Sequence, residues 1–380
     1  MKIQHHALIA LTLSAALSCR QEEPVIRSVR TEVGGCDSGD IKGFYLLNQG
    51  NMGSNNATLD YYDYAEGAYW RNIYPERNPG VVSELGDVGN DLAIYGDRLY
   101  AVINCSNLVE VMDASTARHI DAVSVPNCRN IVFDGEYAYV TSYAGPVQLD
   151  PNARLGYVAK VDLRTLQVVD TCTVGYQPDG MAVSGGRLYV ANSGGYRPSD
   201  YENTFYVVDL DSFDVVGSIE VTDNLFRIVA DAYGRLWVSS RGDNYSAASS
   251  TWLVEPAREP SASRVECIPD LLNSAMALCG DSLYICSSQF SYSTQKYNVS
   301  YAVIDVRSRN VVTRNFITDG TQSRIVRPFG IAVNPVTREI FVTDAGDFVT
   351  PGTLYCFSAA GTLRWSVTTG DIPAHMVFCK

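Results

Sequence analysis

The sequence predicts an all-β fold, a seven-bladed β-propeller of four-stranded antiparallel blades. Two series of apolar runs carry this prediction. The first contains aromatic or large apolar residues and recurs at 44–47, 99–102, 138–141, 188–191, 236–239, 283–286 and 340–343. The second ends at an acidic or polar residue, namely Asp63, Asp113, Asp162, Asp209, Glu255, Asp305 and Ser358. The steps of the second series, 50, 49, 47, 46, 50 and 53 residues, match the length of a propeller blade.

Each repeat reads as four short strands. In the third repeat, an apolar run at 180–183 turns at Gly185-Gly186 into a second run at 187–190, which is a two-residue hairpin signal. Strands at 205–209 and 215–219 follow. No stretch shows the 3.6-residue periodicity of an amphipathic helix, so we expect blades made of strands and turns.

The two ends of the repeat region complement each other. The first repeat begins directly at a second strand, at Phe44, with no first strand before it. The last segment, 372–378, is similar to first strands elsewhere, such as 329–333. We therefore expect the C-terminal strand to complete the N-terminal blade, which closes a propeller over 43–380 and removes open sheet edges. An open solenoid would not leave two complementary part-repeats.

Residues 1–18 are typical of a secretory signal peptide, with Lys2 followed by an apolar run of roughly ten residues that is too short to span a bilayer. The next residue, Cys19, follows small residues and resembles the acylated cysteine of bacterial lipoproteins, although Ala16 stands where Leu is usual. Ordinary cleavage near a chance cysteine is the alternative. We predict lipidation at Cys19, a flexible tether over 19–42, and an outer-membrane protein that is lipid-anchored and exposed at the cell surface.

Composition excludes several classes of function. The chain has 29 basic and 42 acidic residues and a net charge of −13, so nucleic-acid binding is not expected. Only four histidines are present, and two of them lie in the leader, which leaves too few for a multi-histidine metal site. Among the cysteines, Cys105 and Cys128 are a candidate disulfide pair, whereas the hairpin between Cys279 and Cys286 keeps those two apart.

The connections between strands differ in length according to position. Links from first to second strand and from third to fourth strand are short, as at 95–98 and 164–167. Links from second to third strand and between blades are long, as at 192–197 and 240–245. Because strands alternate in direction, the short links share one face of the ring, the short-loop face, and the long links share the other, the long-loop face. Binding residues concentrate on long loops of a rigid scaffold, so we place the ligand site on the long-loop face.

The candidate ligand-binding residues on the long-loop face are mostly aromatic, amide and basic. They are Asn90, Arg129, Tyr143, Asp179, Tyr196, Arg227, Arg241, Tyr245, Asn273, Phe290, Tyr292, Phe329 and His375. Aromatic rings supply apolar area and amides pair with neutral polar groups, which suits a large, flat ligand bearing amides or hydroxyls. We expect no catalytic residue, no metal site and no enzymatic activity.

Several longer motifs resemble known propellers. The segments GYQPDGMAV at 175–183 and LYVANSGG at 188–195 resemble the YncE-type seven-bladed propellers. The segments FYLLNQGNMG at 44–53, DYYDY at 60–64, VQLDPNARLG at 147–156 and TGDIPAH at 369–375 are similar to the BtuG-like cobalamin-binding surface lipoproteins of gut bacteria. This resemblance implies cobalamin (vitamin B12) as a ligand rather than a cofactor, and delivery to a BtuB-like TonB-dependent outer-membrane transporter. It also implies contact with the membrane through the lipid anchor alone. The chemistry fits such a ligand, because an arginine such as Arg129, Arg227 or Arg241 can meet its phosphate.

Two alternatives from other functional classes remain open. An aromatic rim stacks on sugars as well as on corrins, so a surface glycan-binding or adhesion module is the first. A propeller hydrolase of the lactonase type, with Ca²⁺ held by oxygens of Asn90, Asp179 and Asn273, is the second. The absence of a repeated carboxylate on the first strands argues against the hydrolase. For His375 we expect a structural hydrogen-bonding role rather than ligation of cobalt.

Overall fold

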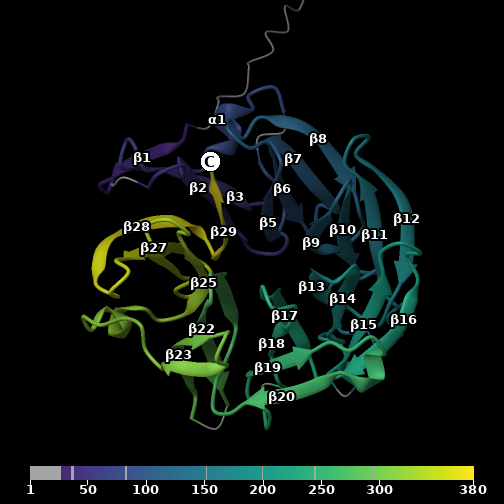
Figure 1. Cartoon of the computed structure of the whole chain (residues 1–380). Coiled ribbons are helices and arrows are strands. Elements are labelled where there is room, and N and C mark those ends of the chain that lie inside the picture. Colours follow the sequence, from purple (N-terminus) through teal and green to yellow (C-terminus); the bar gives the residue numbers. More distant parts are fainter. Residues whose placement is uncertain are drawn as a thin grey trace, which may run out of the picture.

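The computed structural model describes residues 27–35, 38–81, 84–150, 152–198, 200–243, 245–292 and 294–380. The predicted signal peptide at 1–18 and Cys19 lie outside these residues. Seven antiparallel sheets surround a central axis in chain order (Figure 1), which confirms the predicted seven-bladed propeller. Helix is confined to α1 (Tyr74–Arg77) and two 3₁₀ turns, η1 (Pro260–Ala262) and η2 (Thr321–Arg324), in the described part of the chain. None of the described helices is long and apolar enough to cross a membrane.

Blades 2 to 7 each take four consecutive strands, and the first strand of each blade is the innermost (Figure 1). Blade 2 contains β5 (Gly89–Tyr95), β6 (Arg98–Ile103), β7 (Leu108–Asp113) and β8 (His119–Ser124). Blade 3 contains β9 (Cys128–Asp134), β10 (Tyr137–Ser142), β11 (Tyr157–Asp162) and β12 (Gln167–Thr173). Blade 4 contains β13 (Pro178–Ser184), β14 (Arg187–Asn192), β15 (Thr204–Asp209) and β16 (Val215–Glu220). Blade 5 contains β17 (Leu225–Ala230), β18 (Leu236–Ser240), β19 (Ser250–Glu255) and β20 (Arg264–Ile268). Blade 6 contains β21 (Ala275–Cys279), β22 (Ser282–Ser291), β23 (Lys296–Asp305) and β24 (Asn310–Thr313). Blade 7 contains β25 (Pro328–Val333), β26 (Ile340–Asp344), β27 (Pro351–Phe357) and β28 (Leu363–Asp371).

Blade 1 is assembled from both ends of the ring. Its innermost strand is β29 (Pro373–Cys379), which pairs antiparallel with β2 (Gly43–Asn48), with Phe378 opposite Phe44. The strands β3 (Thr58–Asp63) and β4 (Ala68–Arg71) complete it. The predicted closure of the ring by the C-terminal strand is therefore confirmed.

A fifth strand, β1 (Val29–Glu32), pairs antiparallel with β4 on the outer edge of blade 1. The sequence prediction assigned these residues to a flexible tether over 19–42, so the prediction is wrong for this segment. All four residues of β1 are exposed. The strand is held by main-chain pairing rather than by burial of side chains, which is why it leaves no hydrophobic pattern in the sequence.

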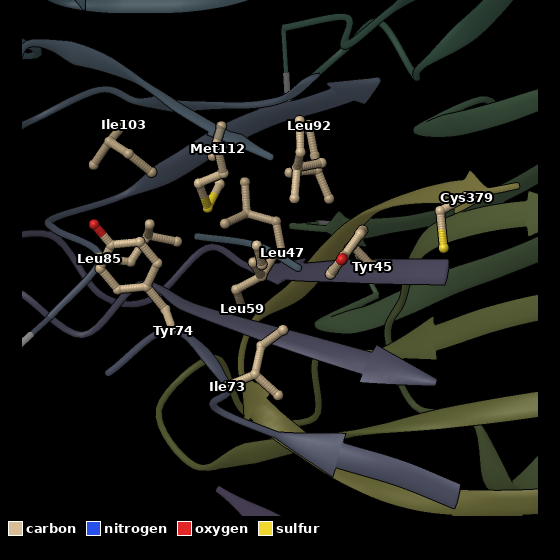
Figure 2. Close-up of a cluster of buried hydrophobic side chains, with 13 residues drawn as sticks. Tyr45, Leu47, Leu59, Ile73, Tyr74, Leu85, Leu92, Ile103, Met112 and Cys379 are labelled. Atoms are coloured by element: carbon tan, nitrogen blue, oxygen red, sulfur yellow. The ribbon is translucent and has the colours of Figure 1, made fainter. Parts of the chain in front are cut away.

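The hydrophobic core is divided among the seven blade interfaces, with one buried cluster at each interface of the described chain. Figure 2 shows the cluster between blades 1 and 2, where Leu47 and Leu59 face Leu92 and Met112. Because each blade is covered on both faces by its neighbours, its second strand is buried on both sides. This explains the continuous apolar runs, such as 188–191, from which the repeat was identified.

The acidic residue at the end of the third strand has a structural role in five blades. In blade 2, Oδ1 of Asp113 accepts hydrogen bonds from the backbone N–H groups of Ser115 and Thr116, at 3.0 and 2.8 Å. The same turn is capped by Asp63, Asp162, Asp209 and Asp305 in blades 1, 3, 4 and 6. These carboxylates stabilise tight turns on the short-loop face.

The cysteine predictions can be compared directly with the sheet register. Cys279 pairs with Ser282 and Cys286 with Ala275, as the hairpin turn predicts. Cys105 and Cys128 are both free thiols, so the candidate disulfide is not formed. The buried Cys128 Sγ instead lies 3.5 Å from the carbonyl oxygen of Ile103.

Candidate ligand-binding site

β-Bulges at the long-loop end of the innermost strands position most of the candidate residues. Antiparallel pairing skips residues there: Asn90 lies between the paired residues Gly89 and Asp91, and Asp179 lies between Pro178 and Met181. Corresponding irregularities in register occur at Arg129 in β9, at Arg227 in β17 and at Phe329 in β25. A bulge re-aims the side chains at the end of a strand, and here it does so around the axis of the ring.

Glycines next to these bulges allow neighbouring innermost strands to approach closely. A Cβ atom at Gly180 would lie 2.3 Å from the carbonyl oxygen of Phe226, and one at Gly330 would lie 2.1 Å from that of Ala374. Real side chains do not tolerate such distances. The absence of a Cβ at Gly180 therefore permits blade 4 to bring Asp179 against blade 5.

A buried ion-pair network lies where the innermost strands of blades 3, 4 and 5 meet. We call Asn90, Asp91, Arg129, Tyr143, Asp179, Arg227, Arg241 and His375 the mouth cluster. Its centre is Asp179, which is 3% exposed. One carboxylate oxygen of Asp179 lies 2.9 Å from Nη1 of Arg241, and the other lies 3.7 Å from Nε of Arg129. The Tyr143 hydroxyl also donates to this carboxylate, at 3.1 Å.

The charges in this network shift the pKa of Asp179 downward. Burial alone would raise it, but the guanidinium groups of Arg241, Arg129 and Arg227 outweigh burial and hold it below its usual value. Asp179 is therefore ionised at neutral pH and forms ion pairs with Arg241 and Arg129. Arg129 also donates to Oδ1 of Asn90, at 3.2 Å, and its guanidinium lies 4.7 Å from the centroid of the Tyr143 ring.

A second group of contacts joins blade 5 to blades 1 and 2. Nε2 of His375 lies 3.4 Å from a guanidinium nitrogen of Arg227, and Nδ1 lies 3.7 Å from Oδ1 of Asp91. Burial, with the positive charges of Arg227 and Arg129, holds the pKa of His375 well below 6.5. The imidazole is therefore neutral, and Nε2 can accept a hydrogen bond from Arg227. This agrees with the structural role that we expected for His375.

Asp91 was not among the predicted site residues. Its Oδ2 accepts hydrogen bonds from the Asn130 side chain, at 2.6 Å, and from the Ile131 backbone, at 3.0 Å. Burial raises its pKa, and the charge of Arg227 opposes that effect. The signal that could have identified it is its place beside Asn90 at the start of an innermost strand.

An arc of aromatic side chains adjoins the mouth cluster over blades 5, 6 and 7. We call it the aromatic arc and define it as Tyr245, Phe290, Tyr292, Tyr297, Phe329 and Phe348. Tyr245 and Tyr292 stack with ring centroids 5.1 Å apart and are 79% and 51% exposed. Phe290 contacts the edges of Tyr292 and Tyr297, with centroids 5.1 and 5.2 Å apart.

Arg327 connects the two parts of this arc. Its guanidinium lies 4.3 Å from the Tyr297 centroid and 5.3 Å from that of Phe348, which packs against Phe329. The predicted strand of this repeat covers 283–286 and leaves Phe290 and Tyr292 to the long-loop face, whereas β22 and β23 extend as a hairpin through Phe290 and Ser291. That extension places Tyr297 opposite Phe290. The sequence analysis therefore missed Tyr297, which lies on a strand.

The mouth cluster and the aromatic arc are connected through the backbone. Gln289 donates from Nε2 to the carbonyl oxygen of Arg241, at 3.3 Å, and accepts from the backbone N–H of Ser249, at 2.8 Å. Because Arg241 contacts Asp179, a continuous set of contacts runs from blade 4 to blade 6. The two groups of residues thus belong to one surface.

A pocket of about 330 Å³ lies beside the mouth cluster, under the long loop between β10 and β11. Tyr143 forms a wall shared by the pocket and the cluster, and the polar side chains of Asp150, Asn152, Arg154 and Gln177 contribute to its lining. Tyr196 contacts two of the lining residues, since its ring lies 6.2 Å from that of Tyr143 and its backbone N–H donates to the Gln177 side chain.

The side chain of the remaining predicted residue, Asn273, makes no hydrogen bond with the mouth cluster among the described residues. It is 1% exposed, and its side-chain nitrogen lies 3.6 Å from the sulfur of Met276. The strand that follows it, β21, pairs with β22 without a bulge, unlike the innermost strands described above. Asn273 therefore stays within the blade 6 packing instead of contacting the mouth cluster.

The candidate site offers few donor groups for a metal ion. The described residues contain no group of three or more His, Cys, Asp or Glu side chains that could hold a metal ion. Of the oxygens considered for Ca²⁺, those of Asp179 face Arg129 and Arg241, and that of Asn90 accepts from Arg129. Guanidinium groups thus occupy the positions that a cation would need, so these residues do not fit a calcium site.

Comparison with known proteins supports the fold. A family model described as "Domain of unknown function (DUF5074)" matches residues 42–378. No curated protein matches the chain. Among solved structures, a quinonprotein alcohol dehydrogenase-like protein from Bacteroides thetaiotaomicron VPI-5482 superposes with a TM-score of 0.58 and 13% identity, over 89% of this chain and 78% of that one.

Two further structures are similar at the same level. A functionally unknown protein from Desulfotomaculum acetoxidans DSM 771 gives a TM-score of 0.59 and 12% identity, over 89% of this chain and 99% of that one. Apo AztD from Citrobacter koseri gives a TM-score of 0.51 and 13% identity, over 90% of this chain and 98% of that one. At such low identity these likenesses show the propeller fold alone.

Proposed function

The chain belongs to the DUF5074 family of unknown function, and from that premise we propose that it is a non-enzymatic surface lipoprotein that captures cobalamin on its long-loop face. One observation carries the proposal: a guanidinium-rich mouth and an exposed aromatic arc lie side by side on the same surface. Cobalamin is a large ligand that combines a flat macrocycle, peripheral amides and a single phosphate. Aromatic rings, buried amides and arginines are the groups that recognise these parts.

The rigidity of the ring favours such a role. The innermost strands are fixed by pairing within each blade and by packing at every blade interface, so the mouth cluster is preorganised before a ligand arrives. Preorganisation reduces the entropy lost on binding. The sequence resemblance at 44–53 and 147–156 supports cobalamin among large ligands, and it supports a BtuB-like TonB-dependent transporter as the receiving partner. The lipid anchor at Cys19 is part of the same proposal.

Isothermal titration of the purified protein with cyanocobalamin tests the capture role. We expect saturable binding near one ligand per chain, together with retention of the coloured ligand on the protein during gel filtration. The variant Tyr292→Ala removes an exposed ring of the aromatic arc and should weaken binding at least tenfold. Tyr233→Ala, which removes a half-exposed ring on the short-loop face, is the control and should bind as the wild type does. Absence of both heat and retained colour in the wild type would refute the proposal.

The stacked pair Tyr245 and Tyr292 favours a second candidate, a glycan-binding module, because exposed aromatic faces also pack against sugar rings. A glycan array distinguishes the two functions. Binding to a defined oligosaccharide that is lost in Tyr245→Ala, with no response to cyanocobalamin, would establish the glycan-binding function.

A further inference from the structure

Arg227 is the guanidinium of the mouth cluster that has no carboxylate partner. Arg129 and Arg241 both face the carboxylate of Asp179. Among the residues that the structure describes, no carboxylate oxygen forms an ion pair with Arg227 within 4.0 Å, and its hydrogen-bond partner is the neutral ring of His375, at 3.4 Å. Its guanidinium also lies 4.4 Å from the centroid of the Phe226 ring.

The formal charges of the cluster do not balance. Three guanidinium groups share two carboxylates, those of Asp179 and Asp91, so the mouth carries at least one net positive charge. Asp91 is further engaged by the Asn130 side chain and the backbone of Ile131. Burial lowers the pKa of Arg227, as expected for a cation whose lost hydration is not fully replaced. A positive charge collected at one mouth of a protein with a net charge of −13 contrasts with the rest of the chain.

A hydrogen-bond donor without a partner in the same cluster also indicates a site for a ligand with acceptor groups. Nε of Arg129 is buried and makes no hydrogen bond within the described part of the chain. A buried polar group that lacks a partner costs free energy, and an acceptor supplied by a ligand removes that cost. Arg129 and Arg227 both lower the pKa of His375 through their charges, so both lie close to the same imidazole.

We propose that the mouth binds an oxyanion of the phosphate class, with Arg227 as its principal partner and Arg129 as a second donor. Guanidinium groups bind such oxyanions through charge-assisted hydrogen bonds. This inference deepens the proposed function, because the phosphodiester in the nucleotide arm of cobalamin is an anion of this class. It also selects Arg227 from the three arginines that the sequence analysis left open. Free inorganic phosphate shares the same chemistry, and the experiments below separate the two sources.

Thermal unfolding tests anion binding without any corrinoid. The midpoint is measured in inorganic phosphate and in sodium chloride of equal ionic strength. We expect phosphate to raise the midpoint by several degrees in the wild type, because a ligand that binds only the folded state stabilises it. The rise should disappear in Arg227→Gln and persist in part in Arg227→Lys. Arg164→Gln loses the same charge at an exposed position of the short-loop face and should respond as the wild type does.

Two results of the unfolding experiment would overturn the inference: no specific rise in the wild type, or an equal rise in Arg227→Gln. The midpoints measured in chloride show whether each variant folds. If Arg227→Gln does not fold, Arg227→Lys decides the matter, because a mouth that binds phosphate through this guanidinium should lose most of its response when the planar donor group is replaced.

A comparison of two corrinoids then assigns the anion. Cobinamide lacks the nucleotide arm and its phosphate. If the mouth takes the cobalamin phosphate, the wild type should bind cobalamin at least tenfold more tightly than cobinamide, and Arg227→Gln should reduce this ratio toward one. Equal affinities in the wild type would overturn the assignment of the anion to the nucleotide arm while leaving cobalamin capture intact. Phosphate stabilisation that depends on Arg227, without binding of either corrinoid, would refute the proposed function and support the anion site.

Discussion

Nη1 of Arg241 lies 2.9 Å from Oδ2 of Asp179, although the two residues belong to different blades. Asp179 lies in the bulge at the start of β13, and Arg241 follows the end of β18. The ion pair therefore joins an innermost strand of blade 4 to a long loop of blade 5. The mouth cluster contributes to blade packing as well as to the candidate site.

Removal of the central carboxylate should destabilise the ring. In Asp179→Asn the buried Arg129 and the partly exposed Arg241 lose their shared counter-ion, and breaking a pair at a buried carboxylate in this way costs about 3 kcal/mol in the free energy of unfolding. Urea unfolding measures the change. Asp211→Asn, at an exposed turn of the short-loop face, is the matched control and should lie within about 0.5 kcal/mol of the wild type. Equal stabilities of the two variants would show that the network contributes nothing to folding.

His375 should make stability depend on pH. Its folded-state pKa lies well below 6.5, so as the pH falls through 6.5 the unfolded chain takes up a proton that the folded chain excludes. Stability associated with this histidine is therefore complete above pH 6.5 and is lost at lower pH. Between pH 7.5 and 5.5 the loss should be about 1 kcal/mol.

The measurement is the urea midpoint of the wild type and of His375→Gln at both pH values. The groups that face this imidazole, Arg227, Arg129 and Asp91, are present in both proteins, so the difference isolates the histidine. The variant should lose less stability than the wild type on acidification. Parallel changes in the two proteins would contradict a depressed pKa for His375.

The interface between blades 7 and 1, which closes the propeller, should be sensitive to the loss of one aromatic side chain. Phe44 is fully buried, and its ring lies 4.7 Å from Phe341 of blade 7 and 5.7 Å from Phe378 of the C-terminal strand, measured between centroids. Phe44→Ala leaves a cavity and should lower the free energy of unfolding by about 3 to 5 kcal/mol. Thermal or urea unfolding measures the loss. The control is Tyr95→Ala, which removes an exposed ring on the short-loop face. A small effect at Phe44 would mean that this interface relaxes or opens locally.

The sequence predicted those parts of the fold that depend on burial. Runs such as 188–191 are apolar because both faces of a second strand are covered, and this property repeats in every blade. Closure at Phe44 and the separation of Cys279 from Cys286 followed from the repeat and from turn geometry. The strand β1 could not be found in this way, because its pairing with β4 uses main-chain groups and leaves its side chains exposed.

The candidate site was predicted only at the level of its face and its residue types. Which residues meet depends on bulges, and a bulge is a change in register that single residue types do not specify. Asp179 and Arg227 lie in bulges and contact the cluster, whereas Asn273 precedes an unbulged strand and does not. Tyr297 was missed because the hairpin of β22 and β23 continues beyond the predicted strand end.

The outer strand β1 has a consequence for orientation. Val29 lies opposite Arg71, and the backbone N–H of Ser28 donates to Glu76 of α1, which belongs to a connection between blades. The upstream chain therefore joins the outer edge of blade 1 at its long-loop end. A lipid at Cys19, as proposed, would be separated from Arg27 by eight residue steps, which span at most roughly 28 Å. The long-loop face would then lie toward the bilayer, with the capped turns of the short-loop face toward the medium and the ligand released on the membrane side.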